Sequence, residues 1–456
     1  MTTLLSNFQT KYEENLNIAL NHLLVVYAFF LPISVGGYAQ SFLFTLMLIM
    51  IVARGKYFYY FKYALTHPVV LAFLLYALMH FLWLIGTDNS QWAERMIEQS
   101  NKALYPIIFM SFLDKKFTLQ ILSGFLAGMM LSELISYAIH FNLIPWQFII
   151  NDISYPWKSH VLDITFYSAH SAIDPSPFLH HSFYAAALAL STSILIYRLL
   201  KENLPRYMEV VSIIFISSMT FNILIIGGRT GYFLYVLLLI ILLFLVYKKK
   251  VLKPLIASLS ILVIVFTLTY QNNGLFTKRI DQTFSTLQAL NENSQNFNSS
   301  FGYRLGIWFY GMGVISDAPL LGVGTGDHMD AVKLKVQKQH NFLKTMPDMH
   351  NQYFEILLQF GLIGLLIFLN IYYQVFKFRP VTEELNGIKF LILTTMIITG
   401  ITATYWHFYL PIYTVLLSAI LVTRETIQKN IALPTLRLAS IYIPLIFISY
   451  IVEKLQ

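Results

Sequence analysis

A lone arginine, Arg229, stands between two apolar runs in the segment IIGGRTGYFLYVLLL. A charge in such surroundings is costly unless it has a partner or a function. Gly227, Gly228 and Gly231 surround it, and glycines let another backbone approach closely. The guanidinium could bind an anion at the edge of an apolar layer, or it could snorkel to the surface of a membrane. Both interpretations place Arg229 at a boundary between apolar and polar surroundings.

A second arginine, Arg304, precedes Trp308 by one helical turn in FGYRLGIWFYGMG, a pattern that indicates an amphipathic helix. Pro319 and the glycine-rich stretch GVGTG at 322–326 follow. This stretch lacks the Gly-Lys-Ser/Thr of a phosphate-binding P-loop, so it does not indicate a nucleotide site. We expect a tight turn there.

His350 precedes an apolar run in DMHNQYFEILLQF, and a histidine near neutral pH can act as a general base. Asp348 and Glu355 are close enough in sequence to hydrogen-bond its imidazole and to fix its tautomer. The alternative is that His350 caps a helix or lies at an interface. Glu355 falls inside the apolar run and therefore needs a partner.

Two weaker sets of polar residues complete the candidates. Arg95 and Lys102 occur in QWAERMIEQSNKALYP, where other basic residues are scarce, and His181 and Tyr184 occur in FLHHSFYAAALAL. The spacing of the histidines in this region matches no familiar zinc pattern, so we predict no metal site at His160, His170, His180 and His181.

The composition shows which elements must position these residues. Of 456 residues, 57% are hydrophobic and 12% are charged, whereas soluble domains are about 45–50% apolar and about 25% charged. The net charge of +8 could suggest nucleic acid, but the basic residues lie between apolar runs, so we expect membrane topology and no nucleic-acid partner. The absence of cysteine excludes disulfides and thiol chemistry.

We therefore predict an all-α, polytopic integral membrane protein with 12 or 13 transmembrane helices. The expected spans are 16–33, 41–53, 68–86, 103–113, 117–141, 179–199, 208–226, 231–247, 254–271, 352–376, 388–405 and 410–423, with 438–451 as a possible thirteenth. Basic residues are concentrated in alternate connections, such as 54–62 and 248–253. By the positive-inside rule these connections are cytoplasmic, together with the N-terminus.

The spans divide the chain into three parts. Residues 1–271 form helices 1–9 with outer loops at 87–102 and 142–178, residues 272–351 form a large outer loop with short helices, and residues 352–456 form the C-terminal helices. The large loop carries Arg304 and ends at His350, so we expect the chemistry to face outward. The sequence shows no pair of matching broken helices, which disfavours an inverted-repeat transporter.

Together these motifs resemble the O-antigen ligase and polymerase superfamily of bacterial cell-envelope glycosyltransferases. Three segments carry the likeness in order and spacing: GGRTG around Arg229, the run from Arg304 to Gly326, and HNQYFEILLQFGLIG from His350. The resemblance covers about residues 179 to 370. Gln359 occupies a position that is often acidic in such proteins, which leaves Glu355 or Asp348 as the nearby carboxylate.

The resemblance implies an enzyme of the bacterial inner membrane that works at the periplasmic face. Such enzymes transfer a glycan from undecaprenyl pyrophosphate to an acceptor hydroxyl, without metal, nucleotide or other cofactor. It implies that Arg229 and Arg304 clamp the diphosphate leaving group and that His350 is the base, with inversion at the anomeric carbon. The residues expected to bind substrate are Arg95, Lys102, His181, Tyr184, Trp308, Asn351 and Glu355, with His181 and Tyr184 at the acceptor.

The acceptor remains open among three possibilities. A ligase uses lipid A–core oligosaccharide, a polymerase uses another lipid-linked repeat unit, and a protein O-oligosaccharyltransferase uses Ser or Thr. We favour the ligase on the likeness of PFLHHSFYAAALAL and GGRTGY to ligase segments. A transporter of lipid or polysaccharide is the alternative from another class, with Glu133 as the chief ionisable residue deep in a span. It does not explain an Arg, Trp and His constellation on one side only.

Overall fold

The computed structural model describes residues 2–33, 38–143, 175–272, 274–291, 297, 299–402 and 406–423. Every regular element in these residues is a helix, so the predicted all-α class is confirmed. Most of the predicted outer loop 142–178, with His160 and His170, lies outside the described residues. The possible span 438–451 and most of the run 291–300 also lie outside them.

The first half of the described chain forms a bundle of apolar helices. Its α-helices are α1 (Thr2–Phe30), α2 (Tyr38–Arg54), α3 (Tyr57–Leu65), α4 (Pro68–Leu82), α5 (Ser90–Ser100), α6 (Tyr105–Met110), α7 (Thr118–His140), α9 (His181–Lys201), α10 (Arg206–Ile225), α11 (Arg229–Tyr247) and α12 (Leu252–Asn272). Short 3₁₀ helices at Asn101–Leu104 (η1), Lys115–Phe117 (η2) and Lys248–Lys250 (η3) connect some of them.

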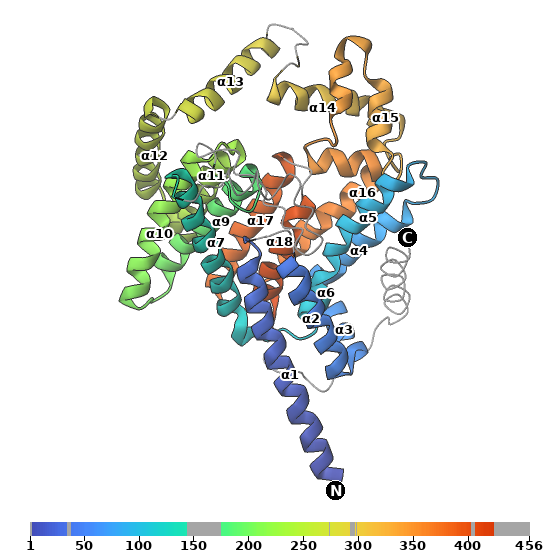
Figure 1. Cartoon of the computed structure of the whole chain (residues 1–456), viewed down its shortest axis with the longest axis vertical. Helices are drawn as coiled ribbons and strands as arrows, with labels where there is room; N and C mark the ends of the chain where they lie inside the picture. Colours follow the sequence, from blue (N-terminus) through green and yellow to red (C-terminus); the bar gives the residue numbers. More distant parts are fainter. Residues whose placement is uncertain are drawn as a thin grey trace.

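The large loop folds into helices before the chain returns to the bundle. It contains α13 (Gly274–Asn291), α14 (Ser300–Asp317), α15 (His328–Lys335) and the 3₁₀ helix η4 (Lys338–Thr345). The C-terminal helices are α16 (Gln352–Lys377), α17 (Glu383–Thr402) and α18 (Trp406–Leu421). Figure 1 shows α13, α14 and α15 at the end of the molecule opposite to the start of α1.

The predicted number of membrane spans is not confirmed. Within the described residues, seven helices are long and apolar enough to cross a membrane, or eight if the bent pair α2 and α3 is one span. The expected span 103–113 is wrong as a crossing, because its only α-helix, α6, has 6 residues. At 1.5 Å per residue, α6 covers about 9 Å of a hydrocarbon layer of about 30 Å.

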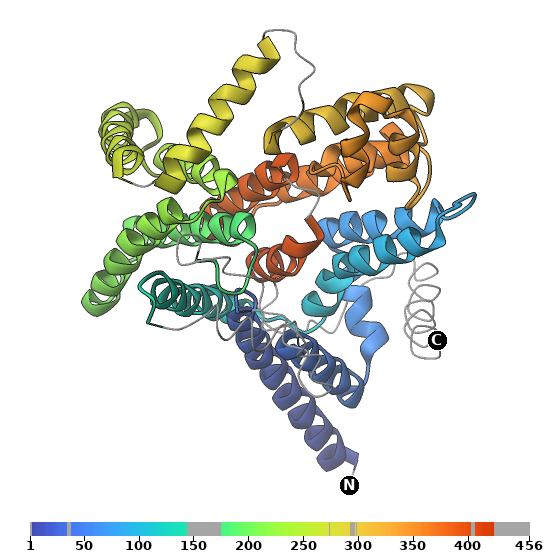
Figure 2. The ribbon, with the colours of Figure 1, turned by 45° about the horizontal axis from the view of Figure 1, so that its top comes forward.

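The two larger hydrophobic cores of the described residues hold most of these helices together. The main core joins α4, α7, α9, α11, α17 and α18 around fully buried side chains such as Phe73, Phe125 and Tyr413. A smaller core joins α14, α15 and η4 to the start of α16 through residues such as Ile307, Val332 and Leu343. Figure 2 shows this smaller unit beside α16 and next to α4 and α5. The loop therefore has a core of its own, which gives it a defined shape at the end of the bundle.

Helix α16 is broken where this unit meets the bundle. Gly361 has φ +60° and ψ −160°, a conformation that essentially only glycine adopts. The backbone of the Pro319–Gly324 stretch lies against the break: Leu362 N–H donates to Pro319 O at 2.9 Å, and Gly324 N–H donates to Gln359 O at 2.9 Å. These bonds satisfy backbone groups that a broken helix would otherwise leave unpaired in an apolar layer.

Candidate active site

His350 lies on the turn immediately before α16. Its φ of +48° is in the left-handed region, which costs a non-glycine residue about 1–3 kcal/mol. Asp348 Oδ1 accepts the backbone N–H of His350 at 2.7 Å and also contacts the ring Nδ1. A carboxylate on Nδ1 favours the tautomer with its proton on Nδ1, which leaves the lone pair on Nε2. The turn thus holds an imidazole oriented as a base would require.

Asn351 gives this turn its connection to the helix. Its side-chain oxygen accepts the backbone N–H groups of Tyr353 at 3.0 Å and Phe354 at 3.2 Å. This is the N-cap arrangement, in which a side chain satisfies the first unpaired donors of a helix. Asn351, and not His350, therefore caps the start of α16. Substrate binding by Asn351 stays a prediction.

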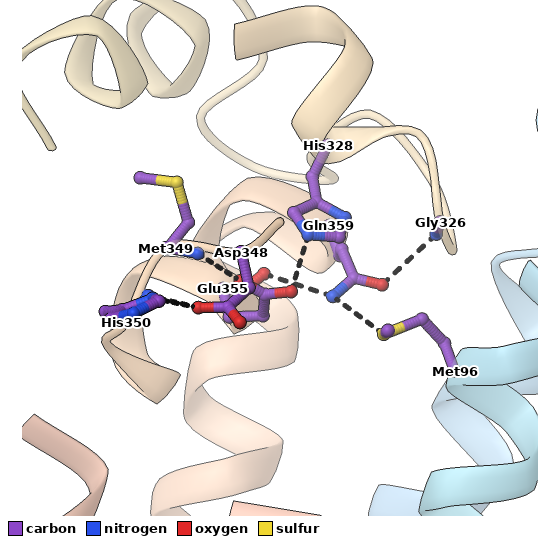
Figure 3. Close-up of polar contacts among 8 residues, drawn as sticks. All are labelled: Met96, Gly326, His328, Asp348, Met349, His350, Glu355 and Gln359. Atoms are coloured by element: carbon purple, nitrogen blue, oxygen red, sulfur yellow. Dashed lines mark hydrogen bonds and ion pairs between the residues drawn. The ribbon is translucent and has the colours of Figure 1, made fainter. Parts of the chain in front are cut away.

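Glu355 is buried one turn into α16, with an exposed fraction of 4%. Its Oε1 lies 2.5 Å from Nε2 of His328, and its Oε2 accepts the backbone N–H of Met349 at 3.2 Å. Of the two carboxylates considered for the His350 imidazole, Asp348 makes that contact and Glu355 contacts His328 instead (Figure 3). His328 was not predicted as a site residue from the sequence. The one sequence signal for such a residue was that Glu355, a carboxylate inside an apolar span, needs a partner.

Trp308, on α14, contacts the turn that carries His350. Its Nε1 donates to the carbonyl oxygen of Met349 at 2.6 Å, and its ring stacks on Phe354 with centroids 5.5 Å apart. Arg304 is partly buried and lies one helical turn before Trp308, so both project from the same side of α14. The helix that supports the histidine turn therefore also carries the arginine predicted for the diphosphate.

The glycine-rich stretch 322–326 is a tight turn, as expected. Gly322, Gly324 and Gly326 all have positive φ, and a Cβ on Gly326 would lie 2.5 Å from the backbone nitrogen of Ala93. The N–H of Gly326 donates to Gln359 Oε1 at 3.2 Å. This turn therefore joins α5 and α16, and its glycines serve close packing.

Arg229 is the first residue of α11 and reaches the large loop. Its Nη1 donates to Thr283 Oγ1 of α13 at 3.2 Å. The preceding turn packs tightly on α9: a Cβ on Gly228 would lie 2.7 Å from the carbonyl oxygen of His181, and one on Gly231 would lie 2.4 Å from the Cβ of Ala185. The glycines around Arg229 therefore bring the start of α9 beside it.

Comparison with protein families finds a match over part of this chain. Residues 213–369 match the family model described as O-Antigen ligase, Wzy_C. The match covers about a third of the chain and supports the resemblance to the O-antigen ligase superfamily. No curated protein matches the chain. The O-antigen ligase family covers ligases and polymerases, which are glycosyltransferase-like enzymes that act on lipid-linked glycans.

The O-antigen ligase match includes all three predicted catalytic residues. Arg229, Arg304 and His350 lie inside it, together with Trp308. Hydrogen bonds around Met349 bring Trp308, His350, Asn351 and Glu355 into one cluster, and Arg304 lies on the helix that supports it. The contact of Arg229 with α13 ties it to the large loop.

His181 and Tyr184 precede the matched segment. The His181 ring lies against that of His180, with centroids 4.0 Å apart at the start of α9. Tyr184 is fully buried inside the bundle, so an acceptor sugar reaches it only if neighbouring side chains move. Their place at the acceptor stays a prediction.

Arg95 and Lys102 also lie outside the matched segment, on α5 and η1. The Arg95 guanidinium is exposed and lies 5.0 Å from the centre of the Trp92 ring. Burial lowers the pKa of Lys102, and Glu98 partly opposes this by favouring the charged form. A partly desolvated ammonium attracts an anion more strongly than one in bulk water does. Because α5 contacts the 322–326 turn, both residues lie on the side of the bundle that holds the loop.

Proposed function

We propose that this protein is a member of the O-antigen ligase superfamily and that it transfers O-antigen glycan from undecaprenyl pyrophosphate to a hydroxyl of lipid A–core oligosaccharide. The reaction takes place at the periplasmic face of the bacterial inner membrane. The single observation that carries the proposal is the contact of Asp348 with His350 on a turn held by Trp308 and Glu355. A histidine oriented in this way is suited to activate a hydroxyl.

In the proposed reaction His350 acts as the general base. Its Nε2 takes the proton of the acceptor hydroxyl as that oxygen attacks the anomeric carbon from the face opposite the diphosphate. The bond from the anomeric carbon to the diphosphate oxygen breaks, and its electron pair leaves with the diphosphate. Attack from the opposite face inverts the configuration at that carbon.

Arg229 and Arg304 are proposed to stabilise the charge that grows on the leaving diphosphate. Arginine stays protonated when partly buried and binds phosphate through two donors. Preorganised donors of this kind contribute about 3–4 kcal/mol each in well-studied enzymes. Arg95 and Lys102 are proposed to assist from α5 and η1, so the clamp needs no divalent metal.

Reconstitution of the purified protein in proteoliposomes tests this function. The vesicles contain undecaprenyl-pyrophosphate-linked glycan and lipid A–core, without added metal or ATP. We expect glycan on the core. Lengthening of lipid-linked glycan without transfer to the core would instead assign a polymerase. Movement of the lipid across the bilayer with no new glycosidic bond would contradict enzymatic function altogether.

A further inference from the structure

His328 and Glu355 form a buried pair between the loop and the bundle. His328 is the first residue of α15, and Glu355 lies near the start of α16. Their exposed fractions are 1% and 4%. Nε2 of His328 lies 2.5 Å from Oε1 of Glu355 (Figure 3). Because both side chains are almost fully buried, their most direct influence on the reaction passes through a neighbour, and substrate binding by Glu355 stays a prediction.

That neighbour is the peptide unit before His350. Oε2 of Glu355 accepts the N–H of Met349 at 3.2 Å, and Nε1 of Trp308 donates to the carbonyl oxygen of Met349 at 2.6 Å. Both polar groups of the Met349 backbone are therefore held by side chains. The next residue is His350, whose φ of +48° persists only where its surroundings enforce it.

His328 prevents Glu355 from turning away from this peptide. The carboxylate is buried against the backbone of Met349, a residue of the apolar core of the loop. A buried carboxylate that loses its partner is strongly destabilised and moves towards other donors or water. With His328 on Oε1, the opposite oxygen stays directed at Met349.

The position of His328 is itself set by α5. Asp327, the residue before it, accepts the N–H groups of Asp88 at 3.0 Å and Asn89 at 2.8 Å. The start of α15 is thereby attached to the start of α5. The contacts run from α5 through His328 and Glu355 to the turn that carries His350.

We propose that His328 and Glu355 are positioning residues for glycan transfer. The pair holds the Met349 peptide so that the His350 imidazole keeps the orientation of a general base. This inference rests on the proposed function, in which His350 is that base. It assigns a role in the reaction to His328, a residue that is almost fully buried.

The test compares His328→Ala, His328→Gln and Glu355→Ala in the reconstituted glycan-transfer assay. We expect His328→Ala to lower kcat at least about tenfold with KM for both substrates within about twofold, because misplacing a catalytic group by about 1 Å costs up to about a hundredfold. His328→Gln keeps a polar side chain facing Glu355 and should recover part of kcat. The double variant His328→Ala/Glu355→Ala should be no worse than the poorer single variant, because both changes break one unit.

His340→Gln is the matched control. His340 is a buried histidine of the same core, and its Nδ1 lies 2.7 Å from the hydroxyl of Tyr310 rather than at the His350 turn. We expect it to change protein abundance without changing kcat per folded molecule. Equal kcat losses in His328→Gln and His340→Gln would overturn the proposal, as would wild-type kcat in His328→Ala. If His328→Ala does not accumulate, a lowered kcat at unchanged KM in Glu355→Ala, with a higher kcat in His328→Gln, supports the proposal, and a wild-type kcat in Glu355→Ala overturns it.

His350→Ala, measured in parallel, separates this inference from the function on which it rests. Activity in His350→Ala would show that His350 is not the general base, and it would overturn both the proposed function and the positioning role of His328 and Glu355. An inactive His350→Ala enzyme beside a fully active His328→Ala enzyme overturns the positioning role alone.

Discussion

Replacing Asp348 by asparagine isolates the contact that orients the catalytic imidazole. Asp348 Oδ1 accepts the His350 N–H at 2.7 Å and contacts Nδ1, and its side chain is 15% exposed. Asparagine can keep the backbone contact, but it loses the charge and can turn its amide group towards Nδ1. That arrangement favours the tautomer with the proton on Nε2, which cannot act as a base.

The size of this effect follows from the contact that is lost. A hydrogen bond to a charged group contributes about 1.5–3 kcal/mol, and each 1.4 kcal/mol corresponds to about tenfold in rate. We therefore expect Asp348→Asn to lower kcat roughly 10- to 150-fold, with KM little changed. The low exposure of the carboxylate limits screening by solvent, so the full range applies.

The assay is initial-rate glycan transfer in proteoliposomes, normalised to folded protein. Asp317→Asn is the control, because Asp317 is exposed on α14 and contacts Lys335 at 2.6 Å. It should leave kcat within about twofold of wild type, since exposed ion pairs contribute little. A kcat for Asp348→Asn within twofold of wild type would refute the orienting role.

Three further substitutions test the surroundings of this histidine. Arg304→Lys should lower kcat about tenfold or more, because a point charge does not reproduce bidentate binding of phosphate; unchanged turnover would count against the clamp. Trp308→Phe keeps the stack on Phe354 but loses the donor to Met349, which costs about 1 kcal/mol or roughly fivefold in kcat; an unaltered rate would mean that the bond does not hold the turn. Gly361→Ala should lower the melting temperature in detergent, because its Cβ would lie 2.2 Å from the carbonyl carbon of Leu320 at φ +60°. Gly313→Ala, whose Cβ meets nothing closer than 4.0 Å, should not lower it, and equal melting of the two variants would contradict the account of the break.

The features that were predictable from the sequence are those set by local patterns. Apolar runs place the long helices, as α11 and α16 illustrate, because hydropathy needs no information about distant residues. Caps and turns are also set by local sequence, and the glycine-rich turn at 322–326 is an example. The expected span 103–113 is wrong as a crossing, because apolar composition does not reveal that α6 ends at Met110 after 6 residues.

The features that escaped prediction depend on contacts between distant segments. The break of α16 at Gly361 needs the 319–324 backbone to complete its hydrogen bonds, and nothing within the run FGLIGLL reveals that partner. The pairing of His328 with Glu355 joins residues on different helices. The support of Met349 by Trp308 joins segments separated by the whole of α15 and η4. Sequence motifs therefore point to His350 and the two arginines, whose roles stay predictions, but not to the residues that hold the turn.

The central claim is that His350 is the base for glycan transfer, and the most direct test is turnover of His350→Ala. Wild type and variant are reconstituted at equal amounts of folded protein, with undecaprenyl-pyrophosphate-linked glycan and lipid A–core, and product on the core is quantified over time. We predict that transfer is abolished in the variant while its membrane abundance is unchanged. Transfer at the wild-type rate would contradict it.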